Sequence, residues 1–496
     1  MSHTDTGLAT RGPTLLQALI PLVFLFFALG LSVYLYGSDS SYGANQIALL
    51  MAGGVAAIIG LRNGLRWEQI QDAIVDGVSS STQAIFILLA VGSLIGTWIL
   101  SGTVPTMIHY GLALLSPSIF YAAACFICAV VALIIGSSWT VAGTLGVALI
   151  GVAQGLGVDP AITAGAVISG AYFGDKMSPL SDTTNMAPAA AGGELFSHVR
   201  HMVWTTAPSI LLALLLFVLV GLGGEPSKGA AVGFDNLQQE LAGQFTLGLH
   251  LLIPLLVVFT LAIKRFPAFP AILVGALLGA VFAVIFQPEA VLRLASDELP
   301  RPLGLLSGAW TAMFSGYKGE SGNEALDSLL NRGGMASMLN TIWLVFCAMS
   351  FGAVMEKVGL LERLMRSVLA MARSTGSLIV ATLVTAFGTN VLAADQYLSI
   401  VLPGRIYRSE YEKRGLAPQN LSRALEDAGT ITSPLIPWNT CGAYMAATLG
   451  VATLDYLPYA FFNLLNPVIA GVMAYAGFKI LHLKPQPQVV HKHPHH

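Results

Sequence analysis

The residues best suited to chemistry lie in one polar stretch between two apolar segments. Residues 174–185 read GDKMSPLSDTTN and offer carboxylate, hydroxyl and amide oxygens. Hard cations prefer oxygen ligands of these kinds. Pro179 cannot continue a regular helix, so carbonyl groups upstream of it are left free for a ligand. The stretch therefore predicts a cation site on a broken helix.

The candidate cation ligands of this stretch are Asp182, Asp175, Ser178, Thr183, Thr184 and Asn185. Asp182 is the first choice for a carboxyl that binds a cation and a proton in turn, because hydroxyls and an amide flank it and no base adjoins it. Burial favours proton uptake by such a carboxyl. Asp175 is the second choice, and its neighbour Lys176 leaves open a local charge pair at the end of a hairpin.

Lys176 itself permits three interpretations. Its ammonium group could compete with a bound cation, or it could hold an anion. Alternatively, the long side chain could extend its charge to the membrane interface from the end of a helix.

The amino-acid composition is typical of a membrane protein. Of its 496 residues, 55% are hydrophobic and only 10% are charged, whereas soluble domains carry about 25% charged residues. The net charge of −2 gives no sign of nucleic-acid binding. The chain is predicted to be an all-α polytopic membrane protein.

Apolar runs of span length locate the predicted crossings. The candidate spans are 14–36, 46–61, 83–101, 118–136, 203–222, 246–263, 269–287, 336–355, 375–392 and 458–478. Residues 138–191 and 393–450 are apolar but interrupted by Gly, Pro and polar residues. Each is predicted to hold a re-entrant hairpin and a discontinuous transmembrane helix, for about 11–13 crossings in total.

An internal repeat supports two related halves. The pattern Gly174-x-x-x-Ser178-Pro179-Leu180 returns about 255 residues later as Gly429-x-x-x-Ser433-Pro434-Leu435. Upstream, residues 136–138 (GSS) are echoed by 388–390 (GTN), and residues 101–102 by 358–359. Broken helices at matching places in two repeats are typical of secondary transporters.

The second half supplies a mirrored set of candidate ligands: Asp395, Asn390, Glu426, Asp427, Ser433, Asn439 and Thr440. An acid such as Asp395 in an apolar region is a functional candidate by default. Adjacent acids point to different faces of a helix, so only one of Glu426 and Asp427 is expected to face the site. The other is placed to pair with Arg423 one turn away.

Basic residues predict the orientation, because Lys and Arg gather in cytoplasmic loops. Residues 102–117 carry no Lys or Arg, but the equivalent loop after span 336–355 carries several. The two repeats are therefore predicted to be inverted. The predicted division is 1–12 cytoplasmic tail, 13–223 first transmembrane repeat, 224–245 external linker, 246–480 second repeat with an external segment at 289–334, and 481–496 cytoplasmic tail.

Longer motifs resemble a known family. Residues 170–185 (GAYFGDKMSPLSDTTN) resemble the signature of NhaC-type Na⁺/H⁺ antiporters, and residues 96–105, 136–140 and 434–439 fit it as well. The resemblance implies a Na⁺/H⁺ exchanger of the bacterial inner membrane, in a superfamily with inverted repeats and re-entrant hairpins. The same family includes exchangers that couple Na⁺ and H⁺ to malate and lactate.

We therefore expect a secondary active transporter that exchanges Na⁺ or Li⁺ for H⁺ by alternating access, without a cofactor. The expected partners are Na⁺, H⁺ and the bilayer, and an organic acid and a second copy of the chain are further candidates. One alternative is a Na⁺/H⁺-coupled carboxylate exchanger, in which Lys176 or half-helix N-termini at Ser178 and Ser433 hold the anion. An ion channel ranks behind it. An enzyme is not expected, since the sequence has no P-loop, metalloprotease motif or nucleophile elbow.

Overall fold

The computed structural model describes residues 12–223, 239–296, 298–320, 326–327 and 330–483. Throughout these ranges the secondary structure is helical, apart from one isolated antiparallel bridge between Leu416 and His482. Most of the predicted tails and of the 224–245 linker lies outside the described residues. The membrane-protein class and the all-helical fold predicted from the sequence are confirmed.

The α-helices of the first half are α1 (Leu15–Tyr36), α2 (Ala44–Arg62), α3 (Trp67–Ser80), α4 (Thr82–Leu100), α5 (Thr103–Leu114), α6 (Phe120–Ile135), α7 (Ser138–Val141), α8 (Val147–Gly155), α9 (Pro160–Met177), α10 (Asp182–Ala191) and α11 (Leu195–Gly223). Those of the second half are α13 (Ile253–Ile263), α14 (Ala268–Phe286), α15 (Pro288–Leu292), α16 (Arg301–Ser315), α18 (Leu339–Lys357), α19 (Leu360–Ala370), α20 (Thr375–Ala393), α21 (Gln396–Lys413), α22 (Pro418–Leu425), α23 (Thr440–Leu449), α24 (Thr453–Tyr456) and α25 (Phe461–Tyr475). Two π-helical turns interrupt this series, η3 (Ala142–Gly146) between α7 and α8, and η6 (Glu426–Thr430) directly after α22.

Nine helices in the described ranges are long and apolar enough to cross a membrane, or ten if the bent pair Thr453–Tyr459 and Phe461–Tyr475 is one span. Fewer helices pass this test than the predicted 11–13 crossings. The span predicted at 246–263 is a shorter apolar helix, Leu249–Ile263. The helices of the broken regions are short or polar, and α21 carries five charged residues: Arg405, Arg408, Glu410, Glu412 and Lys413.

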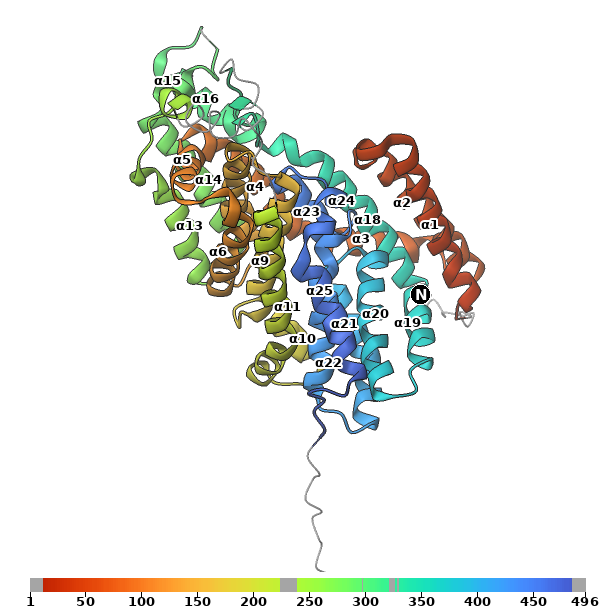
Figure 1. Cartoon of the computed structure of the whole chain (residues 1–496). Helices are drawn as coiled ribbons and strands as arrows, with labels where there is room; N and C mark the ends of the chain where they lie inside the picture. Colours follow the sequence, from red (N-terminus) through yellow and green to blue (C-terminus); the bar gives the residue numbers. More distant parts are fainter. Residues whose placement is uncertain (1–11, 224–238, 297, 321–325, 328–329, 484–496) are drawn as a thin grey trace, which may run out of the picture.

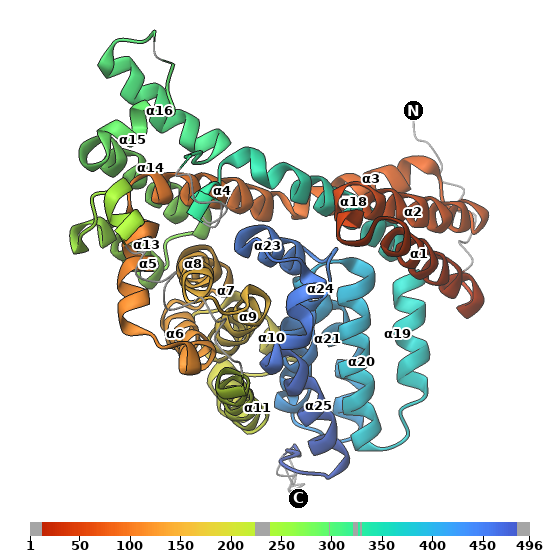
Figure 2. The same ribbon diagram turned by 45° about the horizontal axis from the view of Figure 1, so that its top comes forward.

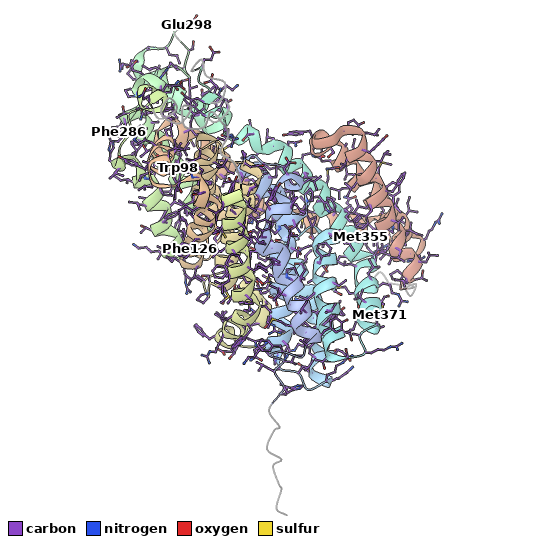
Figure 3. All side chains as sticks on the ribbon, in the orientation of Figure 1. Trp98, Phe126, Phe286, Glu298, Met355 and Met371 are labelled. Atoms are coloured by element: carbon purple, nitrogen blue, oxygen red, sulfur yellow. The ribbon has the colours of Figure 1, made fainter. Side chains whose placement is uncertain are left out.

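The outer surface of the helix bundle is apolar, as a bilayer requires. Large hydrophobic side chains such as Phe126 on α6 and Phe286 on α14 are on the outside, and Phe126 is 58% exposed. Trp98 is fully buried instead, and its indole nitrogen donates to the Gly275 carbonyl oxygen of α14 at 3.0 Å (Figure 3). In Figure 1, α15 and α16 lie at one end of the molecule and α22 lies towards the other.

The order of elements repeats in the two halves. Helices α4 and α18 both lead to a glycine with positive φ, Gly102 at 81° and Gly359 at 78°, after which a short helix begins. Further on, α9 is followed by a break and α10, and α22 is followed by a break and α23. Figure 2 shows α10 beside α21, with α9 and α25 close by. This order matches the predicted repeat, whereas the inverted orientation of the halves stays a prediction.

One predicted correspondence between the halves is wrong. Gly136 ends α6 with φ 77° and Ala394 ends α20 with φ 57°, and the next residues, Ser137 and Asp395, cap the following helices. Residues 388–390 lie inside α20 instead. The left-handed position is held by glycine in one half and by alanine in the other. Because alanine adopts this conformation at a cost of roughly 1–2 kcal/mol, no glycine marked the turn in the sequence.

Small residues allow α9 to pack closely against α6. A β-carbon added to Gly170 would lie 2.0 Å from the Cys125 carbonyl oxygen, and one added to Gly174 would lie 2.5 Å from the Ala129 carbonyl oxygen. This small-x-x-x-small spacing lets two helices approach closely in a membrane. The contact fixes the end of α9, which carries Asp175 and Lys176.

The predicted orientation can be tested with two single cysteines. Lys264→Cys lies in an exposed loop predicted to be cytoplasmic, and Lys318→Cys lies in the segment predicted to be external. We expect a membrane-impermeant maleimide to label only Lys318→Cys in intact cells and to label Lys264→Cys after permeabilisation. The natural cysteines give little background because all four are buried. Labelling of Lys264→Cys in intact cells would contradict this topology.

Candidate functional site

The two broken helices meet in the interior of the protein. Helix α9 ends at Met177, and α10 begins at Asp182 after the turn Ser178–Ser181. The Thr184 hydroxyl donates to the backbone carbonyl oxygens of Asp175 (3.2 Å) and Lys176 (2.9 Å) and so connects the two half-helices. Helix α10 in turn packs against α21 and α22 of the second half. The break therefore lies between the halves of the protein.

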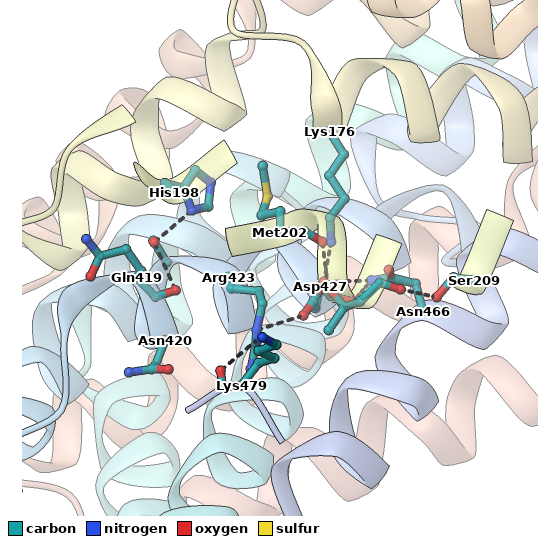
Figure 4. A network of polar contacts seen from close by, with 12 residues as sticks. Lys176, His198, Met202, Ser209, Gln419, Asn420, Arg423, Asp427, Asn466 and Lys479 are labelled. Atoms are coloured by element: carbon teal, nitrogen blue, oxygen red, sulfur yellow. Dashed lines mark hydrogen bonds and ion pairs between the residues drawn. The ribbon is translucent and has the colours of Figure 1, made fainter. Parts of the chain in front are cut away.

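A buried ion pair crosses this boundary. Lys176, in the last turn of α9, points to Asp427 in the π-helical turn η6, and their Nζ and Oδ1 atoms form an ion pair (Figure 4). Both side chains are almost completely shielded from solvent. Lys176 is therefore not a snorkelling residue, and its charge partner is not the neighbouring Asp175.

Asp427 is the centre of a larger network. Its Oδ1 also accepts hydrogen bonds from the Thr205 hydroxyl of α11 and the Asn466 amide of α25, both at 2.9 Å. Arg423, one turn earlier, lies 4.0 Å from Oδ2 through its Nε. The carboxylate thus faces two cations and two neutral donors. Such a set compensates the cost of a buried charge and makes Asp427 an anchor between α9, α11, α22 and α25.

Glu426 has the opposite environment. It is fully buried, and in the described part of the chain neither of its oxygens forms an ion pair or a well-aligned hydrogen bond; the nearby Thr430 hydroxyl is a neutral group that acts on it. The charges that act on it come from Lys176, Asp175 and Asp427. The sequence left open which of the adjacent acids pairs with Arg423. The structure places Asp427 beside it, and no ion pair to Glu426 is found among the described residues. π-Helical turns such as η6 often occur at functional sites.

Asp175 lies on the other face of the end of α9. Its Oδ2 accepts from the Ser138 backbone nitrogen (3.1 Å) and the Ser138 hydroxyl (2.6 Å). Because successive helix residues point about 100° apart, Asp175 faces α7 while Lys176 faces η6. Asp175, Asp182 and Asp395 all lie near enough to Tyr397 to act electrostatically on its hydroxyl. No ion pair to these three acids is found among the described residues.

The oxygen-rich residues of the second break mostly hold the backbone in place. The Asn390 amide donates to the Gly429 carbonyl oxygen at 2.5 Å, and the Asn439 amide donates to the Asn390 side-chain oxygen at 3.1 Å. The Ser433 hydroxyl donates to Gln396 at 3.0 Å. The Thr440 backbone nitrogen donates to the Ala394 carbonyl oxygen. These contacts hold the backbone of the second break in place.

The first-choice residue, Asp182, is exposed and is the first residue of α10, where a helix N-terminus favours a negative charge. Asn185 is also exposed and donates to the carbonyl oxygens of Pro179 and Ser181. Ser178 ends α9, and the Thr183 hydroxyl pairs with that of Ser181. The predicted half-helix N-termini at Ser178 and Ser433 are wrong, because the half-helices begin at Asp182 and Thr440.

In the described ranges, no group of three or more His, Cys, Asp or Glu side chains lies close enough to hold a metal ion. A cation here would need hydroxyl and carbonyl oxygens besides a carboxylate. Sequence reasoning missed Thr205, Asn466, Ser138 and Gln396 as members of the site. Thr205 and Asn466 carry a usable signal, since both are polar residues inside apolar spans.

The anchoring role of Asp427 predicts a stability pattern. Lys176→Met removes one partner of a buried pair and is expected to lower the free energy of unfolding by about 3–5 kcal/mol. Lys176→Met combined with Asp427→Asn should recover much of this loss, because no carboxylate then stays buried without its lysine. Thermal unfolding of purified protein in detergent measures both. A double variant as unstable as the single one would contradict the anchoring role.

The chain is similar in sequence to proteins of known families. The model of the Na⁺/H⁺ antiporter family matches residues 170–478, which contain both broken helices. The Na⁺/H⁺ antiporter NhaC of Alkalihalophilus pseudofirmus is 44% identical over 86% of this chain and 89% of its own length. The malate-2H⁺/Na⁺-lactate antiporter of Bacillus subtilis is 36% identical over 96% and 97%, and the arginine/ornithine antiporter ArcD of Halobacterium salinarum is 36% identical over 96% and 95%. The chain belongs to the Na⁺/H⁺ antiporter family.

Proposed function

We propose that this protein exchanges Na⁺, or Li⁺, for H⁺ by alternating access across the cytoplasmic membrane, with both termini in the cytoplasm. Its membership of the antiporter family and its similarity to NhaC antiporters support the exchange. The bundle of apolar helices around two broken ones supports a transport site at the centre of the bilayer. The orientation rests on the distribution of Lys and Arg.

Glu426 is the observation that carries the proposal. An ionised carboxylate without partners in a protein interior is very costly. Two occupants remove this cost, a proton on the carboxyl group or a cation beside it. In the proposed cycle these occupants exclude each other, and the exclusion couples proton movement to cation movement. The π-helical turn that holds Glu426 lies directly before the break of the second half.

The cation is proposed to bind between Glu426 and the Asp175 side of α9, because Asp175 lies near enough to Glu426 to act on it electrostatically. There, Asp175, Asp182 and Asp395 lie around Tyr397 without a basic partner among the described residues. Hydroxyl groups and free carbonyls at the two breaks complete an oxygen-rich surrounding. On the Lys176 side, two cations surround Asp427 and would repel Na⁺. Asp427 is therefore proposed as a structural anchor, and the other predicted ligands stay candidates.

Proteoliposomes that contain a pH-sensitive dye test the exchange and the role of Glu426 together. Na⁺ or Li⁺ added to wild-type vesicles should dissipate an imposed ΔpH without any organic acid. Glu426→Gln keeps the shape of the side chain but cannot exchange a proton, so we expect Na⁺-dependent dissipation to be lost. Asp455→Asn, which changes an exposed acid of α24, serves as the control. Normal exchange by Glu426→Gln would exclude it as the proton carrier.

The role of Asp182 and Asp175 in cation binding can be tested separately. Asp182→Asn is expected to abolish Na⁺-dependent proton flux without loss of folding, because the exposed carboxylate makes no hydrogen bond that holds the fold together. Asp175→Asn should lose flux and some stability, since the Ser138 contacts weaken. Monodispersity in detergent reports folding. Unimpaired exchange in Asp182→Asn would remove that residue from the cation path.

A Na⁺/H⁺-coupled carboxylate exchanger is the second candidate. The similarity to a malate-2H⁺/Na⁺-lactate antiporter supports it, and so do the two buried cations beside Asp427, which outnumber that carboxylate. In the same vesicles, a ΔpH response that requires malate or lactate would favour this function. A response to Na⁺ alone would favour simple cation exchange.

A further inference from the structure

A cavity of about 440 Å³ lies where three apolar helices end together. Helix α1 begins at Leu15, α2 ends at Arg62 and α18 ends at Lys357, and all three are long and apolar enough to cross a membrane. Helix α2 packs against both of the others, and Figure 2 shows the three at one edge of the molecule. Because the ends of spans mark the boundary between lipid and water, we call this space the interfacial cavity.

The charged side chains that line the interfacial cavity are Lys357, Glu362, Arg363 and Arg366. Glu362 is paired within this set, since its Oε1 accepts from Nε of Arg366 at 2.7 Å. Lys357 and Arg363 are exposed, and neither forms an ion pair with any residue that the structure describes. Two cations at the cavity are therefore available to an anionic ligand.

The interfacial cavity is already formed in this structure. The Gln17 side-chain nitrogen donates to the Asn63 side-chain oxygen at 3.2 Å, which fixes the start of α1 to the end of α2. Across from Pro13, a β-carbon added to Gly359 would lie 3.6 Å from Pro13 Cδ, and one added to Gly12 would have no described atom within 4 Å. Side chains therefore leave room for a ligand between the starts of α1 and α19.

Large apolar side chains lead away from this end of the bundle along the outer face of α1. Leu16, Ile20, Val23 and Phe27 follow one another at helical spacing, and Leu16 and Phe27 are 71% and 69% exposed. The stripe begins three residues after Pro13, which lines the cavity. An acyl chain whose head group occupies the cavity thus has an apolar surface beside it.

We propose that the interfacial cavity binds the phosphate head group of an anionic phospholipid, with Lys357 and Arg363 as its charge partners. Basic pockets between transmembrane helices on the cytoplasmic side are typical sites for such head groups. The distribution of Lys and Arg predicts that side for this end of α2. A free phosphate would meet the same two cations but would leave the apolar stripe of α1 unused. The bound lipid links α1 and α2 to α18 and α19, and its binding does not depend on the proposed exchange.

Native mass spectrometry of the full-length protein in detergent measures lipid binding directly. The protein is titrated with phosphatidylglycerol, which is anionic, and with phosphatidylcholine of the same acyl chains, which has no net charge. We expect the wild type to bind one phosphatidylglycerol roughly thirtyfold more tightly, because each of the two cations contributes about fivefold. Equal affinity for the two lipids would overturn the proposal.

The two unpaired cations can be removed without touching the ion pair of the cavity. Lys357→Gln combined with Arg363→Gln should lower the affinity for phosphatidylglycerol roughly thirtyfold, to that for phosphatidylcholine. Both side chains are exposed, so we expect the fold to be kept, and monodispersity in detergent checks this. Lys357→Arg combined with Arg363→Lys keeps both charges and should bind the lipid as the wild type does.

Lys264→Gln combined with Arg265→Gln is the matched control. These two exposed cations follow α13 in another loop predicted to be cytoplasmic, and they do not line the interfacial cavity. Their removal should leave the affinity for phosphatidylglycerol unchanged. An equal fall in both double variants, or no fall in Lys357→Gln with Arg363→Gln, would contradict a lipid site at the cavity.

Inorganic phosphate distinguishes a lipid from a soluble anion. Because phosphate has no acyl chain to place on α1, an equimolar amount should displace little of the bound phosphatidylglycerol. Displacement of about half of the lipid under these conditions would assign the cavity to a soluble phosphate and overturn its assignment to a lipid.

Discussion

The buried contact between Lys176 and Asp427 is the constraint on which the rest of the site depends. Each partner comes from a different half of the chain, and neither could stay charged in an apolar interior without the other. The pair therefore fixes the end of α9 against the π-helical turn of the second half. Thr205 and Asn466 add neutral donors from within α11 and α25, so both helices contact the same carboxylate.

This arrangement separates two kinds of acid. Asp427 has its charge compensated and serves the fold. Glu426 is its neighbour in sequence but forms no ion pair with any of the described residues, so we propose that its occupancy by a proton or a cation changes during exchange. The end of α9 directs two neighbouring residues to different surroundings. Lys176 faces Asp427, whereas Asp175 lies with Asp182 and Asp395 near Tyr397, where no basic partner is found among the described residues. Close packing of Gly170 and Gly174 on α6 keeps both directions fixed.

Much of this could be predicted from the sequence. Polar residues and prolines in apolar surroundings located both broken helices, and the spacing of Arg423, Glu426 and Asp427 predicted that one of the two acids would pair with Arg423 but left open which one. The long-range contact of Lys176 with Asp427 could not be predicted, because 251 residues separate them and either acid had the right chemistry. The exposure of Asp182 depends on where α10 begins, which local sequence does not determine. The turn at Ala394, which corresponds to the one at Gly136, could not be recognised in the sequence because alanine rarely adopts a left-handed backbone.

Proton release on Na⁺ binding tests the central claim most directly. Na⁺ is added to weakly buffered, purified protein in detergent, and the released protons are followed with a pH dye while binding is measured by calorimetry. Competition at Glu426 predicts that wild-type protein releases protons as it binds Na⁺, and that Glu426→Gln releases far fewer at the same occupancy. Na⁺ binding without proton release in the wild type, or with unchanged release in Glu426→Gln, would contradict the account.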